Sequence, residues 1–473
     1  MTAATHFVGQ AVEPASGCQP AGPGEANCPR PRPKIPGRVL VLLLISSLAS
    51  AATLKVRLAS TTVDMDLESY VAAAVAGEAS ILRSEEALKA MAVAARTYAI
   101  YYRGRHASDG YDLCATTHCQ RLDAGAVTAR IQAAVEATWG EMVWYQGRPA
   151  FACYSRSCGG VTEDAAAVWP ELAARYLRSH RDPYCPSNTW QWRADPVEVV
   201  KALLASQLHT PQRIRDIVIT ARTPSGRARL LDLGRQPISA TAFRFAIGRA
   251  MGWNLLRSDR YEVRGMLFQG SGEGHGVGLC QRGADQMGLD GRGYRDILAF
   301  YYPGTVVGVS GRGLQWQRIA GETIALFTTR PEVDRAVLDQ AERELRAAAR
   351  RTNLPAPAKV EVRLYPDVAT FRDATGEPGS VAAYTVGTRI QIWRREALRH
   401  EMLHVLIEAQ AKAGTPVWFR EGLAGYLDGS GSAPGIAALV KRYGETTVLG
   451  WLKSGLPRDV TAASATAAPT NKR

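Results

Sequence analysis

The chain contains the stretch Leu67-Glu-Ser-Tyr-Val-Ala-Ala-Ala-Val-Ala-Gly77-Glu78-Ala-Ser80, an apolar helical segment that runs directly into a glycine and a carboxylate. A second helix is predicted over residues 84–102, and it carries the cations Lys89 and Arg96. Burial raises the pKa of a carboxyl group and neighbouring cations lower it, so Glu78 can be poised to give a proton and take it back. The spacing alone leaves a simpler interpretation open, in which Glu78 only caps the second helix.

The composition is that of an ordinary globular protein. Its 473 residues are 46% hydrophobic and 21% charged, and this length favours two domains. The formal net charge of +13 suits a polyanionic partner. Because the sequence has no lysine- and arginine-rich run interleaved with aromatic residues, we expect that partner to be the cell envelope and not nucleic acid.

An apolar run at residues 39–48 follows a basic stretch and precedes Ala49-Ser-Ala51. This order is typical of a secretory signal. The run is too short to cross a bilayer comfortably, which takes about 20 residues. We therefore expect cleavage near Ala51 and export to the periplasm, the cell envelope or the extracellular space. An uncleaved signal anchor is the only membrane contact that we consider.

The cysteines divide the remaining chain into two differently built parts. All six of them, Cys114, Cys119, Cys153, Cys158, Cys185 and Cys280, lie before residue 281, and disulfides are the default expectation after export. A turn-rich segment marks the boundary. The predicted organisation is an extension with a signal peptide (1–52), a first domain (53–308), a linker (309–319), a second domain (320–455) and a disordered tail (456–473).

The predicted fold class is α+β, with a mixed α/β domain followed by a small zincin-like α+β domain. In the first part, short strands are expected at residues 54–58, 141–145, 214–220 and 261–268. The second part should open with an amphipathic helix from Pro331. Strands at residues 360–364 and 389–393 and a helix from Arg395 are expected to follow.

Six short motifs occur in order along the first domain. They are Leu67-Glu-Ser-Tyr-Val71, Ala76-Gly-Glu78, Glu86-Ala-Leu-Lys-Ala-Met-Ala-Val-Ala-Ala-Arg96-Thr-Tyr98, Thr116-Thr-His118-Cys-Gln120, Gly159-Gly-Val-Thr-Glu163 and Gly274-His275-Gly-Val-Gly-Leu-Cys-Gln281-Arg-Gly-Ala284. Together they resemble the stage II sporulation protein D family, which includes the LytB amidase enhancers, over residues 54–308. The resemblance implies a lytic transglycosylase that cuts the β-1,4 bond between N-acetylmuramic acid and N-acetylglucosamine in peptidoglycan glycan strands.

The resemblance gives the catalytic role to Glu78. One acid/base is enough, because the sugar's own 6-hydroxyl attacks in place of water and closes a 1,6-anhydro ring. Arg96 is then expected to keep the site electropositive and to orient Glu78 or the substrate, and Lys89, His275 and Gln281 are expected to bind substrate. Two alternatives stay open: His275 is a structural histidine, or the whole domain is a non-catalytic wall-binding module that enhances an amidase.

Four positions depart from the resembled family. Met91 stands where Gln is usual and Arg282 where Tyr is usual, whereas Cys158 and Cys280 replace a common Ser. The motifs that contain these two cysteines should line one groove. We therefore expect a disulfide between Cys158 and Cys280.

A candidate second metal site lies where Cys114, His118 and Cys119 come close together in sequence. Zinc accepts cysteine and histidine in a tetrahedron. Some members of the resembled family bind zinc at this place with an upstream histidine, for which His106 is the local candidate. A disulfide is the competing expectation in an exported protein, and the sequence leaves both open.

The second domain carries His400-Glu-Met-Leu-His404 on a predicted helix. Residues four apart share a helix face, so both histidines can reach one zinc ion while Glu401 points beside it towards a bound water. Glu421 is the candidate third ligand. This set leaves the fourth position open, as catalytic zinc requires.

Residues 398–406 and 418–427 of this part resemble the peptidase MA-like (gluzincin) domains. The resemblance implies a zinc metallopeptidase in which His400, His404 and Glu421 bind the metal, Glu401 is the general base, and a peptide or protein is the substrate. Gly425 stands where such domains often carry Glu. The alternative is an inactive or metal-free relic that docks a partner.

Overall fold

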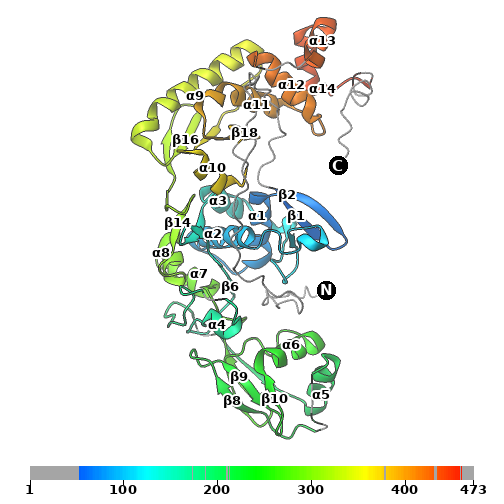
Figure 1. Cartoon of the computed structure of the whole chain (residues 1–473), viewed down its shortest axis with the longest axis vertical. Helices are drawn as coiled ribbons and strands as arrows, with labels where there is room; N and C mark the ends of the chain where they lie inside the picture. The colour runs from blue at the N-terminus through cyan, green and yellow to red at the C-terminus, as the bar shows by residue number, and fades with distance from the viewer. Residues whose placement is uncertain are drawn as a thin grey trace, which may run out of the picture. The chain divides into compact units, whose positions relative to one another are not determined.

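The computed structural model describes residues 53–458 and 460, apart from 173, 187, 209–210, 212, 378–379 and 431–433. These residues form two compact units. The first unit consists of residues 53–139 and 150–304, and the second consists of residues 140–149 and the described residues from 305 onward. The expected α+β class is confirmed (Figure 1). The expected signal and most of the expected tail lie outside the described residues.

Helix α2 (Glu85–Tyr101) is the central element of the first unit, and it confirms the helix predicted over residues 84–102. It packs on α1 (Leu67–Glu78), α3 (Ala129–Ala137), α7 (Gln281–Leu289) and α8 (Tyr294–Tyr301). Alanine is frequent on α1 and α2, and most of both helices is buried. These small side chains allow α1 and α2 to pack closely. Because α2 also contacts α7, the last residue of α1 and the first residue of α7 are held near one another.

Short strands surround these helices. β1 (Thr53–Leu58) pairs antiparallel with β2 (Thr61–Asp66) and parallel with β3 (Leu113–Cys114). β2 runs into α1, whose first turn is capped by the Asp66 carboxylate. β6 (Tyr154–Ser155) pairs with β13 (Leu279–Cys280), which leads directly into α7. The 3₁₀ turns Ala107–Asp109 and Ala124–Ala126 and the short helix α4 (Ala165–Val168) complete this part.

A second hydrophobic core of the first unit lies between residues 190 and 268. Its elements are β7 (Thr189–Arg193), α5 (Pro196–Ala205), β8 (Val218–Arg222), β9 (Ala228–Asp232), β10 (Pro237–Ser239), α6 (Ala240–Met251), β11 (Tyr261–Arg264) and β12 (Leu267–Ser271). The single strand expected over residues 261–268 was wrong. Gly265 has a φ of 59° and turns the chain, so β11 and β12 form a hairpin.

The second unit contains a five-stranded sheet in the order β15-β16-β17-β19-β18. The strands are β15 (Gln317–Ala320), β16 (Ile324–Thr328), β17 (Val360–Leu364), β18 (Ala383–Val386) and β19 (Arg389–Ile392). The three central strands run parallel, and both edge strands run antiparallel to their neighbours. A separate small sheet joins β14 (Val306–Gly308), β4 (Met142–Tyr145) and β5 (Arg148–Pro149).

Helices accompany this sheet: α9 (Pro331–Thr352), α10 (Val368–Thr375), α11 (Leu398–Gln410), α12 (Val417–Asp428), α13 (Pro434–Tyr443) and α14 (Glu445–Ser454). The helix predicted from Pro331 is confirmed as α9. The one predicted from Arg395 begins as a 3₁₀ turn and becomes α11 at Leu398. α11 contacts α9, α12 and β18, so its histidines are fixed between several elements.

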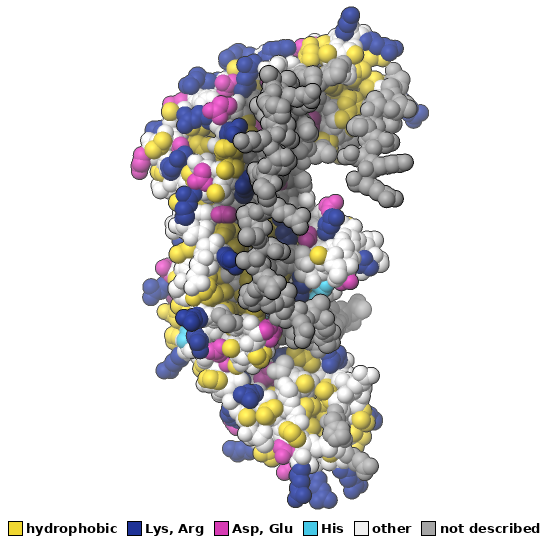
Figure 2. Space-filling view, viewed as in Figure 1, with side chains coloured by type: hydrophobic (Ala, Val, Ile, Leu, Met, Phe, Trp, Pro, Cys, Tyr) yellow, Lys and Arg dark blue, Asp and Glu magenta, His cyan; other side chains and the backbone are white. Residues whose placement is uncertain are grey.

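Basic side chains are spread over the face of each unit drawn in Figure 2, with acidic ones among them. On this face the basic side chains are therefore not gathered in one patch. No helix in the described part of the chain combines the length and the apolar character needed to cross a membrane.

Candidate functional site

Glu78 is the last residue of α1 and is partly exposed. Its Oε1 accepts a hydrogen bond of 2.8 Å from the backbone N–H of Arg121. The preceding Gly77 permits this contact, because a Cβ there would lie 2.2 Å from the Arg121 carbonyl oxygen. The loop that carries Arg121 therefore packs directly on the helix end and fixes the carboxyl group.

Burial raises the pKa of Glu78 from 4.5 to about 7, against the lowering effect of the Arg121 N–H and the Arg121 charge. At neutral pH the carboxyl group is therefore present in both protonation states. A group in this condition can serve as a general acid in one step and as a general base in the next.

Gln281, the first residue of α7, lies beside Glu78. Its side-chain amide donates a hydrogen bond of 3.2 Å to the Glu78 backbone carbonyl, and the residue is 2% exposed. Its Oε1 is a buried atom that has no hydrogen-bond partner among the described residues. The structure thus brings this predicted site residue next to Glu78, where its contact is with the backbone.

Gln120 and Tyr154 extend the polar surroundings of Glu78. The Gln120 amide donates a hydrogen bond of 2.9 Å to the Tyr154 hydroxyl, and its Oε1 is buried without a partner among the described residues. Burial, followed by the Glu78 charge, raises the pKa of Tyr154. Neither residue was predicted as a site residue, although Gln120 ends the motif Thr116-Thr-His-Cys-Gln120.

The structure corrects the role expected for Arg96. The side chain is fully buried, and its Nε donates a hydrogen bond of 2.8 Å to the Glu68 carboxylate on α1. A second guanidinium N–H binds the other carboxylate oxygen of Glu68. Because no part of Arg96 reaches the surface, it cannot contact a glycan, and its charge is compensated by Glu68. Arg96 therefore joins α1 to α2.

Lys89 and His275 both contact other residues of the first unit. Lys89 forms an ion pair of 2.6 Å with Glu86, whose other oxygen accepts a hydrogen bond from the Tyr294 N–H. His275 is 8% exposed, and its Nδ1 accepts a hydrogen bond of 3.0 Å from the Val277 N–H. Burial lowers the pKa of His275 to about 3, so its ring is neutral. The contacts of His275 are those of a structural histidine.

The candidate metal donors His106, Cys114, His118 and Cys119 converge, with ligand atoms that all lie within 4.8 Å of one another. Cys119 Sγ lies 3.4 Å from His106 Nε2, and each thiol lies 3.7 Å from His118 Nδ1. The two thiols are not joined in a disulfide. Two cysteines and two histidines are a donor set that fits zinc.

Asp109 is an additional residue of this cluster that the sequence analysis missed. Its carboxylate lies 3.6 Å from His106 Nδ1, which leaves Nε2 directed at Cys119. Carboxylates commonly orient metal-binding histidines in this way.

His400, His404 and Glu421 also converge within 4.8 Å. His404 Nε2 lies 3.1 Å from His400 Nε2 and 3.3 Å from Glu421 Oε2. Both histidines come from α11 and Glu421 comes from α12, so the contact between these helices assembles the set. Two histidines and a glutamate fit a zinc site that keeps one position open.

Glu401 is 5% exposed and accepts a hydrogen bond of 2.7 Å from the Thr385 hydroxyl on β18. Asp428, the last residue of α12, lies 2.6 Å from His400 Nδ1. Gly425 lacks the carboxylate that is common at its position, and Asp428 was not predicted as a site residue. Asp428 lies three residues further along the same helix, and its carboxylate fixes the orientation of the His400 ring.

The disulfide expected between Cys158 and Cys280 is absent, since both residues are free thiols. Their contact is a hydrogen bond of 3.2 Å from the Cys158 N–H to Cys280 Sγ. Cys185, which the sequence analysis did not connect with them, lies in the same cluster.

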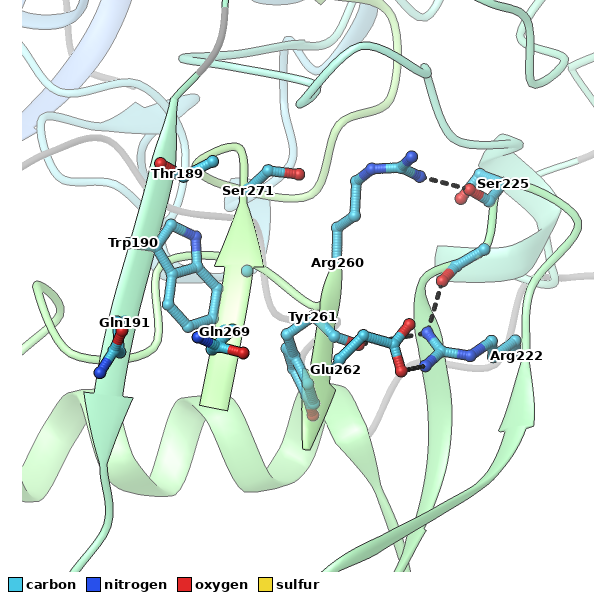
Figure 3. Close-up of a pocket in the computed structure, with 12 residues that line it drawn as sticks. Thr189, Trp190, Gln191, Arg222, Ser225, Arg260, Tyr261, Glu262, Gln269 and Ser271 are labelled. Atoms are coloured by element: carbon cyan, nitrogen blue, oxygen red, sulfur yellow. Dashed lines mark hydrogen bonds and ion pairs between the residues drawn. The ribbon is translucent and has the colours of Figure 1, made fainter. Parts of the chain in front are cut away.

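A cavity of about 800 Å³ lies on the β7–β12–β11 sheet, apart from the predicted site residues. Figure 3 shows Trp190, Tyr261 and Gln269 on its sheet side. The charged side chains that line the cavity are bound to other lining residues. Arg222 pairs with Glu262 at 2.7 Å, and Arg260 donates a hydrogen bond of 2.6 Å to the Ser225 carbonyl. Because these contacts engage the charged side chains of the wall, they do not indicate which ligand the cavity would bind. We therefore assign no function to this cavity.

Comparison with known proteins finds a family match in the N-terminal part of the chain. Residues 58–145, which include Glu78 and the His106–Cys119 cluster, match the family model described as stage II sporulation protein. The similarity to this family therefore lies in the N-terminal half of the chain.

Individual relatives extend this similarity. An uncharacterized protein of Brachyspira hyodysenteriae is 31% identical over 245 residues, which cover 51% of this chain and 66% of the relative. Stage II sporulation protein D of Bacillus amyloliquefaciens is 28% identical over 263 residues, or 51% of this chain and 74% of the relative. An amidase enhancer of Bacillus subtilis is 26% identical over 275 residues, which are 47% of this chain but 38% of that protein. The chain thus covers just under two thirds of the first relative and a much smaller share of the amidase enhancer.

Proposed function

We propose that the first unit is a lytic transglycosylase that cleaves peptidoglycan glycan strands between N-acetylmuramic acid and N-acetylglucosamine. The observation that carries the proposal is Glu78, a partly exposed carboxyl group at a fixed helix end with a pKa of about 7. Similarity to stage II sporulation protein D and to an amidase enhancer supports a role at the cell wall. An exported, envelope-associated location follows from this substrate.

In this mechanism Glu78 performs both proton transfers. The protonated carboxyl group donates its proton to the glycosidic oxygen as the bond breaks. The resulting carboxylate then removes the proton from the 6-hydroxyl of the N-acetylmuramic acid, and that oxygen closes the 1,6-anhydro ring. The Arg121 N–H holds one carboxyl oxygen during both steps. Gln281 and Gln120 are buried beside the site, where the Gln281 amide donates to the Glu78 carbonyl and the Gln120 amide donates to the Tyr154 hydroxyl.

We further propose that the second unit is a zinc metallopeptidase. His400, His404 and Glu421 would hold the ion, and Asp428 would keep His400 oriented. Zinc, when bound, acts as a Lewis acid and makes a bound water more acidic. Glu401 would accept the proton of the attacking water, and the Thr385 hydroxyl fixes its carboxylate for that task. Peptide stems are attached to the same polymer as the glycan, so the two activities are chemically compatible.

Incubation of the protein with purified sacculi, followed by mass spectrometry of the products, tests both proposals. We expect muropeptides that end in 1,6-anhydro-N-acetylmuramic acid, and their loss in Glu78→Gln. Ordinary reducing ends would contradict the mechanism. The absence of glycan products together with stimulation of an added amidase would favour the amidase-enhancer alternative.

New peptide termini that persist in Glu78→Gln and disappear in Glu401→Gln would identify the second activity. A second unit that binds no zinc would instead favour a partner-docking relic.

A further inference from the structure

Three cysteines and one aspartate form a cluster that neither proposed activity uses. Cys158 lies in the loop after β6, Cys185 and Asp182 lie in the segment before β7, and Cys280 ends β13. Their three sulfur atoms and a carboxylate oxygen all lie within 4.8 Å of one another. Cys158, Asp182 and Cys280 are buried, whereas Cys185 is partly exposed.

We propose that Cys158, Cys185, Cys280 and Asp182 form a structural zinc site. Zinc is bound in proteins by thiolates, imidazoles and carboxylates, and structural sites supply all four ligands of a tetrahedron from the protein. This cluster offers four such donors. It leaves no position for water or substrate, so its role is structural and not catalytic.

Hydrogen bonds around the cluster orient the sulfur atoms as ligands. The backbone N–H groups of Cys158 and Gly283 point at Cys280 Sγ from 3.2 and 3.4 Å, and the Ser157 hydroxyl lies 3.4 Å from Cys185 Sγ. The site therefore already contains the outer contacts that tune metal–thiolate bonds.

Asp182 is held with one oxygen directed at the thiols. Its Oδ1 accepts hydrogen bonds of 3.1 Å from the N–H groups of Tyr184 and Cys185. Its Oδ2 accepts one of 2.9 Å from the Tyr301 hydroxyl and lies 3.1 Å from Cys158 Sγ. Gly283 is required beside it, because a Cβ there would lie 2.6 Å from Oδ2.

The four donors have no cationic partner in the described part of the chain. Asp182 is 2% exposed and forms no ion pair with a lysine or arginine in the described part of the chain. Ionisation of these buried groups is costly unless a cation balances their charge, so their deprotonation would accompany the binding of an ion. One divalent ion compensates these charges. A disulfide between two of the three cysteines would leave the third thiol and the carboxylate without a role.

The site would stabilise the region around Glu78. Cys280 directly precedes Gln281, whose amide donates to the Glu78 carbonyl. An ion bound to Cys158, Cys185 and Cys280 would fix the start of α7 relative to two loops that are distant in sequence. Its loss should therefore loosen the helix end on which Gln281 lies.

Cobalt(II) titration of the full-length protein tests this proposal, because cobalt bound by thiolates shows an intense charge-transfer absorption. The Cys114→Ser/Cys119→Ser double variant removes the thiols of the other cluster. In this background we expect cobalt to give a thiolate band, and zinc to compete it away. Further substitution of Cys185→Ser should weaken the band and remove about one bound zinc ion per chain.

Cys153→Ala is the matched control, since Cys153 is a buried free cysteine outside both clusters. It should leave the band unchanged in the same background. A band that is absent from the double variant, or unaffected by Cys185→Ser, would overturn the proposal. So would a disulfide between any two of Cys158, Cys185 and Cys280 in protein isolated from the envelope.

Alkylation of the double variant covers the case in which Cys185→Ser does not fold. Cys185 is partly exposed, so its labelling can be followed in the native protein by peptide mass mapping. Bound zinc should protect Cys185, and a chelator should abolish that protection. Equal labelling with and without zinc would contradict the site.

Discussion

The side-chain amide of Gln281 binds the backbone carbonyl of Glu78 across 3.2 Å, although 203 positions separate the two residues in the sequence. The end of α1 and the start of α7 are thereby joined at the proposed catalytic residue. Removal of this bond should change the position of Glu78 more than its chemistry. The first prediction concerns this contact.

Gln281→Met keeps the length of the side chain but cannot donate the hydrogen bond. We expect the glycan-cleavage kcat to fall about tenfold or more, because a small displacement of a catalytic group is costly. Stability should fall by only about 1 kcal/mol. Gln286→Met, on the partly exposed face of the same helix, is the control and should leave kcat unchanged. Equal effects of the two substitutions would argue against a positioning role.

The second prediction concerns the pH dependence of stability. The pKa of Glu78 is about 7 in the folded state, whereas its ordinary value of 4.5 applies to the unfolded chain. As pH rises, the unfolded chain therefore loses this proton before the folded protein does. Glu78 therefore destabilises the fold progressively between about pH 4.5 and 7, and Glu78→Gln should be the more stable protein above pH 7, by up to about 3 kcal/mol. Denaturant unfolding near pH 4 and pH 8 measures the difference, which should nearly vanish at the lower pH.

The third prediction uses the same titration to describe catalysis. The first proton transfer needs the protonated form of Glu78, so kcat/KM for glycan cleavage should decline as pH rises above about 7. A rate profile on soluble glycan strands gives this pKa directly. A decline centred near the ordinary glutamate pKa would show that the pKa of Glu78 is not raised.

The fourth prediction concerns the buried pair of Arg96 and Glu68. Arg96→Met leaves a buried carboxylate without its cation and should cost about 3–5 kcal/mol of stability. Glu68→Leu/Arg96→Met removes both charges and should recover much of that loss. Thermal unfolding of the two variants measures the coupling. If the double variant is no more stable than the single one, the pair is not the main interaction of Arg96.

The fifth prediction separates metal binding from chemistry in the second unit. Asp428→Asn should weaken zinc binding about 10- to 100-fold, because His400 loses the carboxylate that orients it. His404→Ala removes a ligand and should lose the ion. Glu401→Gln should keep about one zinc per site while losing peptidase activity. Zinc titration and peptide cleavage measured on the same variants distinguish these outcomes.

Local patterns in the sequence were sufficient to predict several elements. The helix over residues 84–102 follows from its apolar composition and from Ser84, whose hydroxyl caps Ala87. The pairing of His400 with His404 follows from their helical spacing. In each case the two interacting residues lie within one or two helical turns of each other in the sequence.

Contacts between distant segments could not be predicted in this way. The role of Arg96 depends on Glu68, which lies on a different helix, so its charge suggested a substrate contact that burial excludes. Asp428 reaches His400 only because α12 packs on α11. The grouping of Cys158 and Cys280 with Cys185 and Asp182 depends on how three loops meet. The predicted zinc ions, the catalytic roles and the domain boundaries stay predictions.

Strands β4 and β5 belong to the second unit, although residues on both sides of them in the sequence belong to the first. The chain therefore passes between the units three times. β4 pairs with β14, and the Trp144 indole donates a hydrogen bond of 2.8 Å to the Gly308 carbonyl. A fragment that starts after residue 308 would lack both strands. Neither unit can therefore be deleted, exchanged or inherited as one uninterrupted piece of the gene.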